Sequence, residues 1–337
     1  TGDNVLIEKI TFRNFNFTND GGAIAWFGNN GTLKNCNFIN NTAKLNGGCI
    51  FWEGDNGNVI SSIFTNNTAK CYDGGGGAIY WNGTNGTLFS SIFTNNKATN
   101  PLSLGGAIHW KGINGLLNSS TFTNNSARDG AGVFWSGANG LLIDSTLDNN
   151  TCTDASTVFW AGANGTLSGS IFTNNTSKNV AGGVWWTGVN GILINCNFIG
   201  NIANQDGGAI CWRGVNGLLK GCTFNNNVAT RYYGGAIDWN AANGNIIDSV
   251  FTNNTAVLGG ACYIQDKSNI TTLTNCTFNN SKTTNQRFNG ICTYRILNIN
   301  GGSGIVDILN QATISGISIV VLNNETYYYP PNTNINF

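Results

Sequence analysis

The stretch GGAIYWNGTNGTLFSSIFTNNKA, residues 76–98, recurs with variations along most of the chain. Aligning the copies places a Trp in one slot every 25 to 29 residues: Trp26, Trp52, Trp81, Trp110, Trp135, Trp160, Trp186, Trp212 and Trp239. A second slot holds Phe, with one Leu, at the same rhythm: Phe12, Phe38, Phe64, Phe93, Phe122, Leu147, Phe172, Phe198, Phe224, Phe251 and Phe278. Repeats of this length indicate a solenoid, in which each repeat stacks on the next.

Within each repeat, slots that are apolar in nearly every copy alternate with slots whose residue type changes from copy to copy. The slot of Ile79 is almost always aliphatic, whereas the slot of Tyr80 holds aromatic, polar and charged residues. A period of two is typical of a strand with one buried face. A second strand pattern surrounds Leu88 and Phe93, and Gly and Asn pairs mark the turns. Because no stretch keeps a period of 3.6, the sequence predicts an all-β parallel β-helix, a single solenoid of about 10–11 coils of roughly 26 residues.

Two polar features of the repeat support stacked coils. An Asn pair follows the Phe slot, and its first member occurs as Asn40, Asn66, Asn95, Asn124, Asn149 and Asn174. The second member occurs as Asn41, Asn67, Asn96, Asn125, Asn150 and Asn175. Stacked amides can hydrogen-bond along such a column, and Asn tolerates the left-handed backbone of a sharp corner. Short insertions around residues 71–73 and 100–102, just before the glycines, predict a loop on one face.

The composition excludes several classes of function. The chain has 337 residues, of which 9% are charged, with 16 Lys and Arg against 16 Asp and Glu. A neutral chain without basic clusters lacks the electrostatic signature of nucleic-acid binding. No apolar run reaches about 18 residues, so we expect no membrane span. Thr1 replaces a starting Met and no signal-like apolar run follows, so we expect a processed or excised segment of a secreted protein.

The repeat predicts one array over residues 1–283, followed by a strand-rich tail over residues 284–337. The ends of a β-helix carry main-chain groups that lack a strand partner. We therefore expect the tail to cap the last coil, to supply an inter-subunit strand, or to begin a stalk. End-to-end association of copies into a homo-oligomer or filament follows from the same consideration.

The repeat resembles two families of surface proteins. Gly207-Gly208-Ala209-Ile210 and Phe172-Thr173-Asn174-Asn175 resemble the G-G-A-[ILV] and F-x-x-N motifs of the polymorphic outer-membrane adhesins of chlamydiae. The Asn-rich version, with Asn275-Cys276-Thr277-Phe278, looks more like the adhesin-like surface proteins of methanogenic archaea. The resemblance covers about residues 5–283. It implies a right-handed coil and a role in surface display and contact, and it carries over no catalytic residue.

An enzyme acting on polysaccharide is the main alternative, since such sites need clustered carboxylates. Asp238 and Arg213 lie on neighbouring coils and can meet, and we interpret them as an ordinary surface ion pair rather than a catalytic pair. His109 is the only His and occupies the variable slot, where we expect a solvated residue rather than a general base. The ten Cys lack C-x-x-C spacing. We predict no catalytic residues, no cofactor and no metal.

The variable slot is the best candidate for binding. Seven of its residues would form an exposed aromatic ridge: Phe51, Tyr80, His109, Phe134, Phe159, Trp185 and Tyr263. Exposed apolar strips mark interaction surfaces. The equal alternative is that the insertions or the tail cover this ridge, which would make it part of the packed interior rather than a binding surface. The Trp slot shares the parity of the aliphatic slot, so we interpret it as a core stack rather than a platform for sugar rings.

Two kinds of covalent modification fit the sequence. Glycosylation motifs outside the Asn columns begin at Asn82, Asn269 and Asn324. Cys196 and Cys222 occupy one small slot, otherwise mostly Ser, on adjacent coils, and both a disulfide and a pair of buried thiols fit that spacing.

We therefore expect an extracellular structural and adhesive protein of the cell surface. In this interpretation a rigid β-helical rod contacts surfaces, and its partners are other copies of the chain, cell-surface glycans or proteins. The polysaccharide-degrading enzyme, a lyase or hydrolase, remains the alternative.

Overall fold

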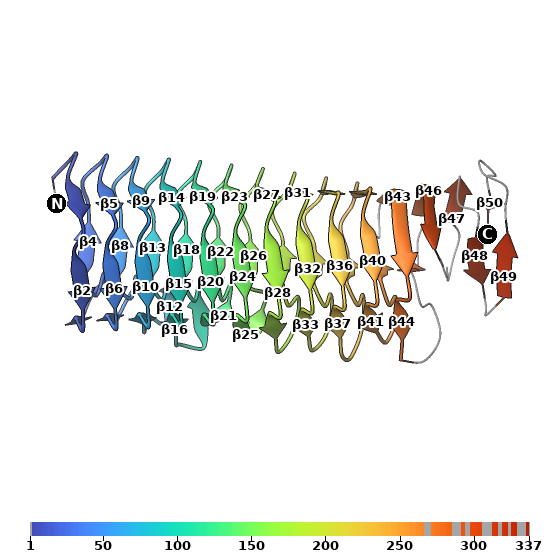
Figure 1. Cartoon of the computed structure of the whole chain (residues 1–337), viewed down its shortest axis with the longest axis horizontal. Helices are drawn as coiled ribbons and strands as arrows, with labels where there is room; N and C mark the ends of the chain where they lie inside the picture. The colour runs from blue at the N-terminus through green and yellow to red at the C-terminus, as the bar shows by residue number, and fades with distance from the viewer. Residues whose placement is uncertain are drawn as a thin grey trace. The chain divides into compact units, whose positions relative to one another are not determined.

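The computed structural model describes residues 2–265, 271–284, 291–293, 297–304, 312–315, 319–322, 325–328 and 335–336. The chain divides into two compact units, residues 1–171 (unit 1) and 172–337 (unit 2). Throughout the described residues the regular elements are strands, without a helix. Each unit is a parallel β-solenoid, which confirms the fold predicted from the repeat (Figure 1). The handedness of the coil stays an inference from the family resemblance.

Each coil of unit 1 contributes four short strands, which we name by the residue type that they bury. The Leu strands are β1 (Leu6–Glu8), β5 (Thr32–Lys34), β9 (Asn58–Ile60), β14 (Thr87–Phe89), β19 (Leu116–Asn118), β23 (Leu141–Ile143) and β27 (Thr166–Ser168). The Phe strands are β2 (Thr11–Arg13), β6 (Asn37–Ile39), β10 (Ile63–Thr65), β15 (Ile92–Thr94), β20 (Thr121–Thr123) and β24 (Thr146–Asp148). The Ala strands are β3 (Asn16–Phe17), β7 (Thr42–Ala43), β11 (Thr68–Ala69), β16 (Lys97–Ala98), β21 (Ser126–Asp129) and β25 (Thr151–Ala155). The Trp strands are β4 (Ile24–Trp26), β8 (Ile50–Trp52), β13 (Ile79–Trp81), β18 (Ile108–Trp110), β22 (Val133–Trp135) and β26 (Val158–Trp160).

Neighbouring coils of unit 1 pair in parallel and in register. Trp81 of β13, for example, lies opposite Trp52 of β8 on one side and Trp110 of β18 on the other. The two insertions form short strands, β12 (Asp73–Gly75) and β17 (Leu102–Leu104), rather than irregular loops. They pair with each other, and β17 also pairs with β21. Insertions of equal length in adjacent coils stay in register, which allows their main chains to hydrogen-bond.

Unit 2 repeats the same four rows. Its Leu strands are β31 (Ile192–Ile194), β35 (Leu218–Lys220) and β39 (Asn245–Ile247), and its Phe strands are β32 (Asn197–Ile199), β36 (Thr223–Asn225) and β40 (Val250–Thr252). Both rows continue into the longer β43 (Thr271–Asn279). The Ala strands are β29 (Thr176–Ser177), β33 (Ile202–Ala203), β37 (Val228–Ala229), β41 (Thr255–Ala256) and β44 (Lys282–Thr283). The Trp strands are β30 (Val184–Trp186), β34 (Ile210–Trp212), β38 (Ile237–Trp239), β42 (Cys262–Ile264) and β45 (Ile291–Thr293), and β28 (Ile171–Thr173) spans the border between the units.

Parallel pairing in unit 2 continues beyond residue 283, where the side-chain repeat ends. β45 pairs with β42, β46 (Leu297–Gly304) with β43, and β47 (Ala312–Ser315) with β46. Antiparallel pairs follow, between β47 and β50 (Ile335–Asn336) and between β48 (Ile319–Leu322) and β49 (Glu325–Tyr328). Because main-chain pairing does not need the repeat's side chains, stacking can outlast the motif. The division at residues 283–284 and the role of the tail stay predictions.

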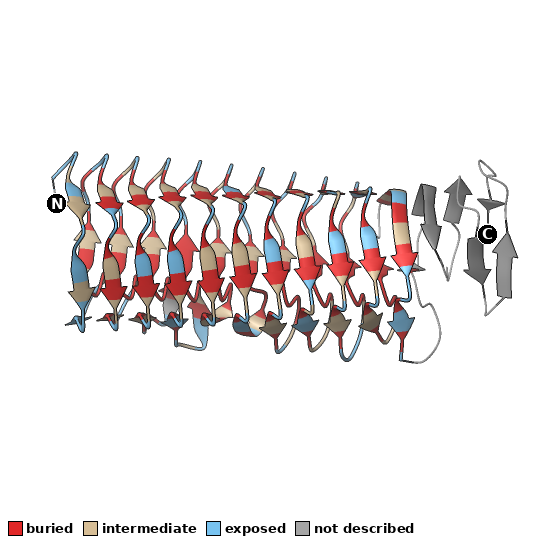
Figure 2. Cartoon of the chain, in the orientation of Figure 1, coloured by how far each residue is buried: buried red, intermediate tan, exposed pale blue. Residues whose placement is uncertain are grey.

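The core of each unit consists of columns of identical inward side chains, visible as buried bands at the same place on successive coils (Figure 2). The rings of Trp26 and Trp52 lie 4.6 Å apart with their planes within 2°. All nine Trp of this slot are fully buried. The interpretation of the Trp slot as a core stack is thus confirmed. Gly86 lies against this stack, since a Cβ there would fall 2.4 Å from Nε1 of Trp81.

The two Asn of each pair have different structural roles. The first takes the left-handed corner, with φ of 56° at Asn95, as predicted. The second is fully buried and forms the predicted ladder: the main-chain N–H and Nδ2 of Asn67 both donate to Oδ1 of Asn96, each at 3.0 Å. Nδ2 of Asn67 also donates to the Phe38 carbonyl at 2.9 Å. The same bonds recur in unit 2 from Asn175 through Asn254, and these bonds offset the cost of removing the amide from water.

A further amide ladder was not anticipated from the sequence. The Asn of the Asn-Gly turns is left-handed. In most of these turns its Nδ2 donates to Oδ1 of the Asn one coil earlier. Asn85, for example, donates to Asn56 and accepts from Asn114, both at 3.0 Å. The sequence indicates these Asn-Gly pairs as turns, and a turn alone explains them without a ladder. Across the part of the chain that the structure describes, there is no helix of the length and apolarity needed to cross a bilayer.

Candidate binding surface and carboxylate clusters

The aromatic residues of the variable slot do form a column on unit 1, because the Trp strands that carry them pair in register. Phe51 lies opposite Tyr80, Tyr80 opposite His109, and Phe134 opposite Phe159. The rings of Phe51 and Tyr80 stack at 5.4 Å, and those of Phe134 and Phe159 at 4.7 Å. We call these five residues the outer aromatic column. It is the predicted ridge as far as unit 1 is concerned.

The column is less exposed than the sequence suggested. Phe51, Tyr80, Phe134 and Phe159 are half-buried, and His109 is only 5% exposed, so the prediction of an exposed ridge is wrong in degree. Phe51 and Tyr80 cover one face of each other, as do Phe134 and Phe159, and the ring of His109 lies between the two pairs. Nζ of Lys111 also lies 5.7 Å from the centre of the Tyr80 ring. What remains accessible is a line of ring edges, which does not offer the flat faces on which sugar rings stack.

His109 is a buried spacer within the column. Its ring meets Tyr80 and Phe134 edge-on, at interplanar angles of 73° and 76°. Nδ1 is buried without a hydrogen-bond partner. Burial, reinforced by the charge of Lys111, lowers the pKa of His109 to about 3. The expectation of a solvated residue is therefore wrong, and the imidazole is neutral at physiological pH.

The corresponding slot of unit 2 has a different character. It holds Trp185, Cys211, Asp238 and Tyr263, of which only Trp185 is half-buried and the other three are buried. The ring of Tyr263 stacks on that of Tyr233 at 4.2 Å. The prediction that Tyr263 belongs to an exposed ridge is wrong, because a residue from the slot just before the glycines covers it.

Asp238 and Arg213 meet, as the sequence allowed, but not at the surface. Nη2 of Arg213 lies 2.5 Å from Oδ2 of Asp238, whose side chain is 3% exposed. Cys211 donates its S–H toward the same oxygen at 3.8 Å, and Oδ1 of Asp238 is buried without a partner. Burial raises the pKa of Asp238, and Arg213 offsets part of that rise. An ordinary surface ion pair is thus the wrong description, and a carboxylate sealed in this way cannot reach a polymeric substrate.

Sequence reasoning missed Asp206, the second carboxyl of this cluster. Oδ1 of Asp206 accepts a hydrogen bond from the N–H of Tyr233 at 3.2 Å. Burial and the neighbouring charge of Asp238 raise the pKa of Asp206 to about 6. A signal was available, because Asp precedes the left-handed glycine in three repeats, at Asp20, Asp129 and Asp206.

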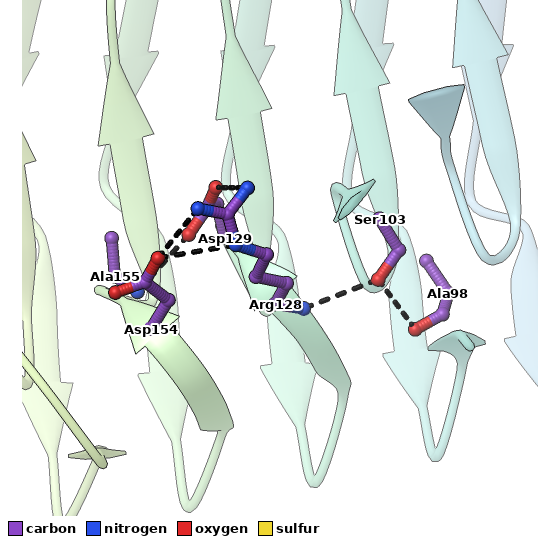
Figure 3. Close-up of polar contacts among 6 residues, drawn as sticks. All are labelled: Ala98, Ser103, Arg128, Asp129, Asp154 and Ala155. Carbon is purple, nitrogen blue, oxygen red and sulfur yellow. Dashed lines mark hydrogen bonds and ion pairs between the residues drawn. The ribbon is translucent and has the colours of Figure 1, made fainter. Parts of the chain in front are cut away.

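Unit 1 contains a comparable cluster next to its insertions (Figure 3). Arg128 donates to Oδ2 of Asp154 from Nη2 at 2.7 Å and from Nε at 3.1 Å, and its Nη1 lies 3.5 Å from Oδ2 of Asp129. Oδ1 of Asp129 accepts from the N–H of Ala155 at 3.1 Å. Burial raises the pKa of Asp129 to about 6, against the opposing charge of Arg128. The hydroxyl of Ser103, on β17, accepts the N–H of Arg128 at 3.2 Å.

Both clusters place one Arg among two carboxyls, and one carboxyl in each, Asp129 or Asp206, has its pKa raised to about 6. The ion pairs of each cluster join neighbouring coils. Within the described residues no group of three or more His, Cys, Asp or Glu is arranged to hold a metal ion.

The structure places the remaining predicted residues as follows. Cys196 and Cys222 are two buried thiols rather than a disulfide, each donating to a main-chain carbonyl at 3.3 Å. Nδ2 of the half-buried Asn82 donates to Oε1 of Glu53 at 2.9 Å. Asn269 and Asn324 lie outside the described residues. Glycosylation at these three positions stays a prediction.

Comparison with known proteins supports the repeat and leaves the activity open. The repeat of the Chlamydia polymorphic membrane protein matches residues 61–80 and 248–265. Each match joins an F-T-N-N motif to the following G-G-A, and one lies in each unit. No curated protein matches the chain. One solved structure, described as "Crystal structure of Agl-KA catalytic domain", matches with 15% identity and a TM-score of 0.39, over 88% of this chain and 62% of that chain. This chain thus spans less than two thirds of that one, and so weak a likeness carries no argument about function.

Proposed function

We propose that this chain is an adhesin-like protein of the cell surface, displayed outside the cell and making contact with other surfaces. The observation that carries the proposal is the pair of matches to the Chlamydia polymorphic membrane protein repeat. The matched repeat is that of a polymorphic membrane protein of Chlamydia, and from this likeness we propose surface display for this chain. The further likeness of its Asn-rich motifs to surface proteins of methanogenic archaea remains part of the proposal.

The distribution of chemistry over the coil supports a contact role. The inward side chains pack in the core or form amide ladders. Only the outward side chains are therefore available to contact a partner and to differ from coil to coil. The chain is 9% charged and has no net charge, which favours neutral partners over nucleic acid or anionic membranes. We propose cell-surface glycans or proteins as partners, with the outer aromatic column of unit 1 as the contact site. Because its rings offer edges, a protein surface or the rim of a glycan fits better than sugar rings stacked face to face.

We propose no catalytic role. The pair that the enzyme alternative requires, Asp238 and Arg213, is closed to substrate by burial of the carboxylate. If the alternative were right, a panel of acidic and neutral polysaccharides would reveal turnover that Asp238→Asn abolishes. End-to-end filaments, glycosylation and secretion remain predictions.

Binding of the purified protein to arrays of glycans, to extracellular proteins and to whole cells tests the proposal. We expect saturable binding that weakens at least ten-fold in the Tyr80→Ala/Phe134→Ala variant. Tyr72→Ala is the matched control, since Tyr72 is 68% exposed but lies on the first insertion, outside the column. Binding that neither variant changes would move the contact site elsewhere. A folded protein that binds none of these surfaces would contradict the adhesive function itself.

A further inference from the structure

Coil 1, formed by β1 to β4, differs from every following coil of unit 1 at three inward slots. The pairing of β2 with β6 aligns Ile10 with Cys36, a slot that is Ser in the later coils. The pairing of β3 with β7 aligns Phe17 with Ala43 and Phe15 with Asn41. Large apolar side chains therefore replace small or hydrogen-bonding ones. Ile10, Phe15 and Phe17 are 46%, 49% and 46% exposed.

In the other coils two of these slots supply hydrogen-bond acceptors to the preceding coil. Oγ of Ser62 accepts the main-chain N–H of Cys36 at 3.1 Å. Oδ1 of Asn67 accepts both the main-chain N–H and Nδ2 of Asn41, each at 3.0 Å. The same three bonds join the next coils, from Ser62 to Ser91 and from Asn67 to Asn96. The coils that carry Ser62 and Ser91 thus each satisfy three N–H donors of the coil before them.

Coil 1 provides neither of these two acceptor atoms, because the side chains of Ile10 and Phe15 have no polar atom. It can still donate: the N–H of Phe15 is bonded to Oδ1 of Asn41 at 3.1 Å. A further coil of this repeat, stacked in register on the outer edge of coil 1, would bury three N–H groups without acceptors. Buried donors of this kind are strongly disfavoured. The bulk of Phe15 and Phe17 adds a steric mismatch with slots that hold Asn and Ala elsewhere.

Charged side chains on the same edge act in the same direction. Lys9 lies 4.0 Å from a carboxylate oxygen of Glu8, and Arg13 ends β2. Charges along an edge strand oppose pairing with another strand edge. In a chain with 9% charged residues, Glu8, Lys9 and Arg13 fall within six consecutive positions of coil 1.

We propose that the outer edge of coil 1 rejects in-register stacking by a further regular coil of this repeat. The proposal rests on the side chains at residues 10, 15 and 17. It goes beyond the adhesive function and stands whether or not that function is confirmed. The end-to-end filament expected from the sequence stays a prediction.

A chain with one extra coil tests the proposal directly. A copy of residues 190–215, a regular coil without insertions, is placed immediately before Asn4 in two backgrounds, wild type and Ile10→Ser/Phe15→Asn/Phe17→Ala. Hydrogen–deuterium exchange then reports whether the added coil is ordered. We expect exchange close to that of an unfolded peptide in the wild-type background, and protection at least ten-fold greater in the triple variant.

Two controls keep the outcome interpretable. The same copy inserted before Asn30 meets the Oδ1 acceptor of Asn41 and should be protected, which shows that the coil itself can fold. Coils built from residues 58–160 must stay protected in every chain, and Phe15→Asn alone serves if the triple variant does not fold. Equal protection of the added coil in both backgrounds would overturn the proposal.

Discussion

Tyr80 and Trp81 are neighbours on one strand, yet the two sides of that strand follow different rules. Trp81 lies in a column of identical, fully buried rings, and the inward Asn and Ser slots repeat with similar regularity. The outward slot of Tyr80 changes from aromatic residues in unit 1 to Cys211 and Asp238 in unit 2. An inward side chain packs against the equivalent residues of the adjacent coils, so the same residue type can fill that slot in every coil. Outward, each residue meets a different neighbour, and the slot can carry a different chemistry in each coil.

Replacing Trp81 by Ala should have the largest effect on stability. Removing a fully buried indole costs about 3–5 kcal/mol of unfolding free energy, because the truncation leaves a cavity that the Trp rings on either side do not fill. Tyr80→Ala, on the adjacent outward slot, should cost about 1 kcal/mol, since a half-buried ring loses less contact. Urea denaturation followed by circular dichroism measures both. Equal losses for the two variants would erase the distinction between the two sides.

Asn96→Ala should come next, at about 3 kcal/mol. The change removes the Oδ1 that accepts two donors of Asn67, and each buried donor left without an acceptor costs about 1–3 kcal/mol. Lys97→Ala is the control, because Lys97 is exposed on the adjacent strand position. The same urea titration applies. If Asn96→Ala unfolds at the wild-type urea midpoint, the inward ladder does not stabilise the coil.

Arg213→Met should destabilise unit 2 by about 2–4 kcal/mol at pH 7, because it leaves the buried Asp238 without its cation. Adding Asp238→Leu should recover most of that loss, since an apolar pair of similar volume removes the buried charge altogether. Thermal unfolding of the single and double variants measures both steps. A double variant no more stable than Arg213→Met would mean that the pair does not act through charge.

The two clusters should make the protein more stable in mild acid than at neutral pH. Asp129 and Asp206 have pKa values of about 6 in the folded state against an ordinary 3.8, so the folded chain binds their protons more tightly. Their stabilising contribution is complete below about pH 4 and is lost as the pH rises through 6, by about 1–3 kcal/mol. Urea midpoints measured from pH 4 to pH 7 report this loss.

The control for this pH dependence is the Asp129→Asn/Asp206→Asn variant. Asn occupies the same slot at Asn46, where its Oδ1 accepts the N–H of Gly75 at 3.1 Å, so the variant keeps the hydrogen bond and loses the titration. Its stability should vary less between pH 4 and pH 7 than that of the wild type. Identical pH profiles would show that the carboxyls do not titrate in this range.

The same contrast decides what the sequence could predict. The inward residues were predictable because Trp81, Phe93 and Asn96 recur in fixed slots, and periodicity alone assigns them to the core. Exposure in the outward slot was not predictable, because the cover over Tyr263 comes from Tyr233, a position that the repeat leaves variable. His109 and Asp238 were placed at the surface for the same reason. Asp206 escaped notice because its role depends on Asp238 in the next coil, a pairing that only the register of the coils reveals.

Hydroxyl-radical footprinting of the folded protein, followed by mass spectrometry, tests most directly the claim that inward slots build the solenoid while outward slots face its surroundings. Trp81 and Trp110 should be protected almost completely, Phe51 and Phe134 should react at intermediate rates, and Tyr72, at 68% exposure, should react fastest. His109 should be protected like the inward residues although its slot is outward. Labelling of Trp81 at a rate close to that of Tyr72 would contradict the account.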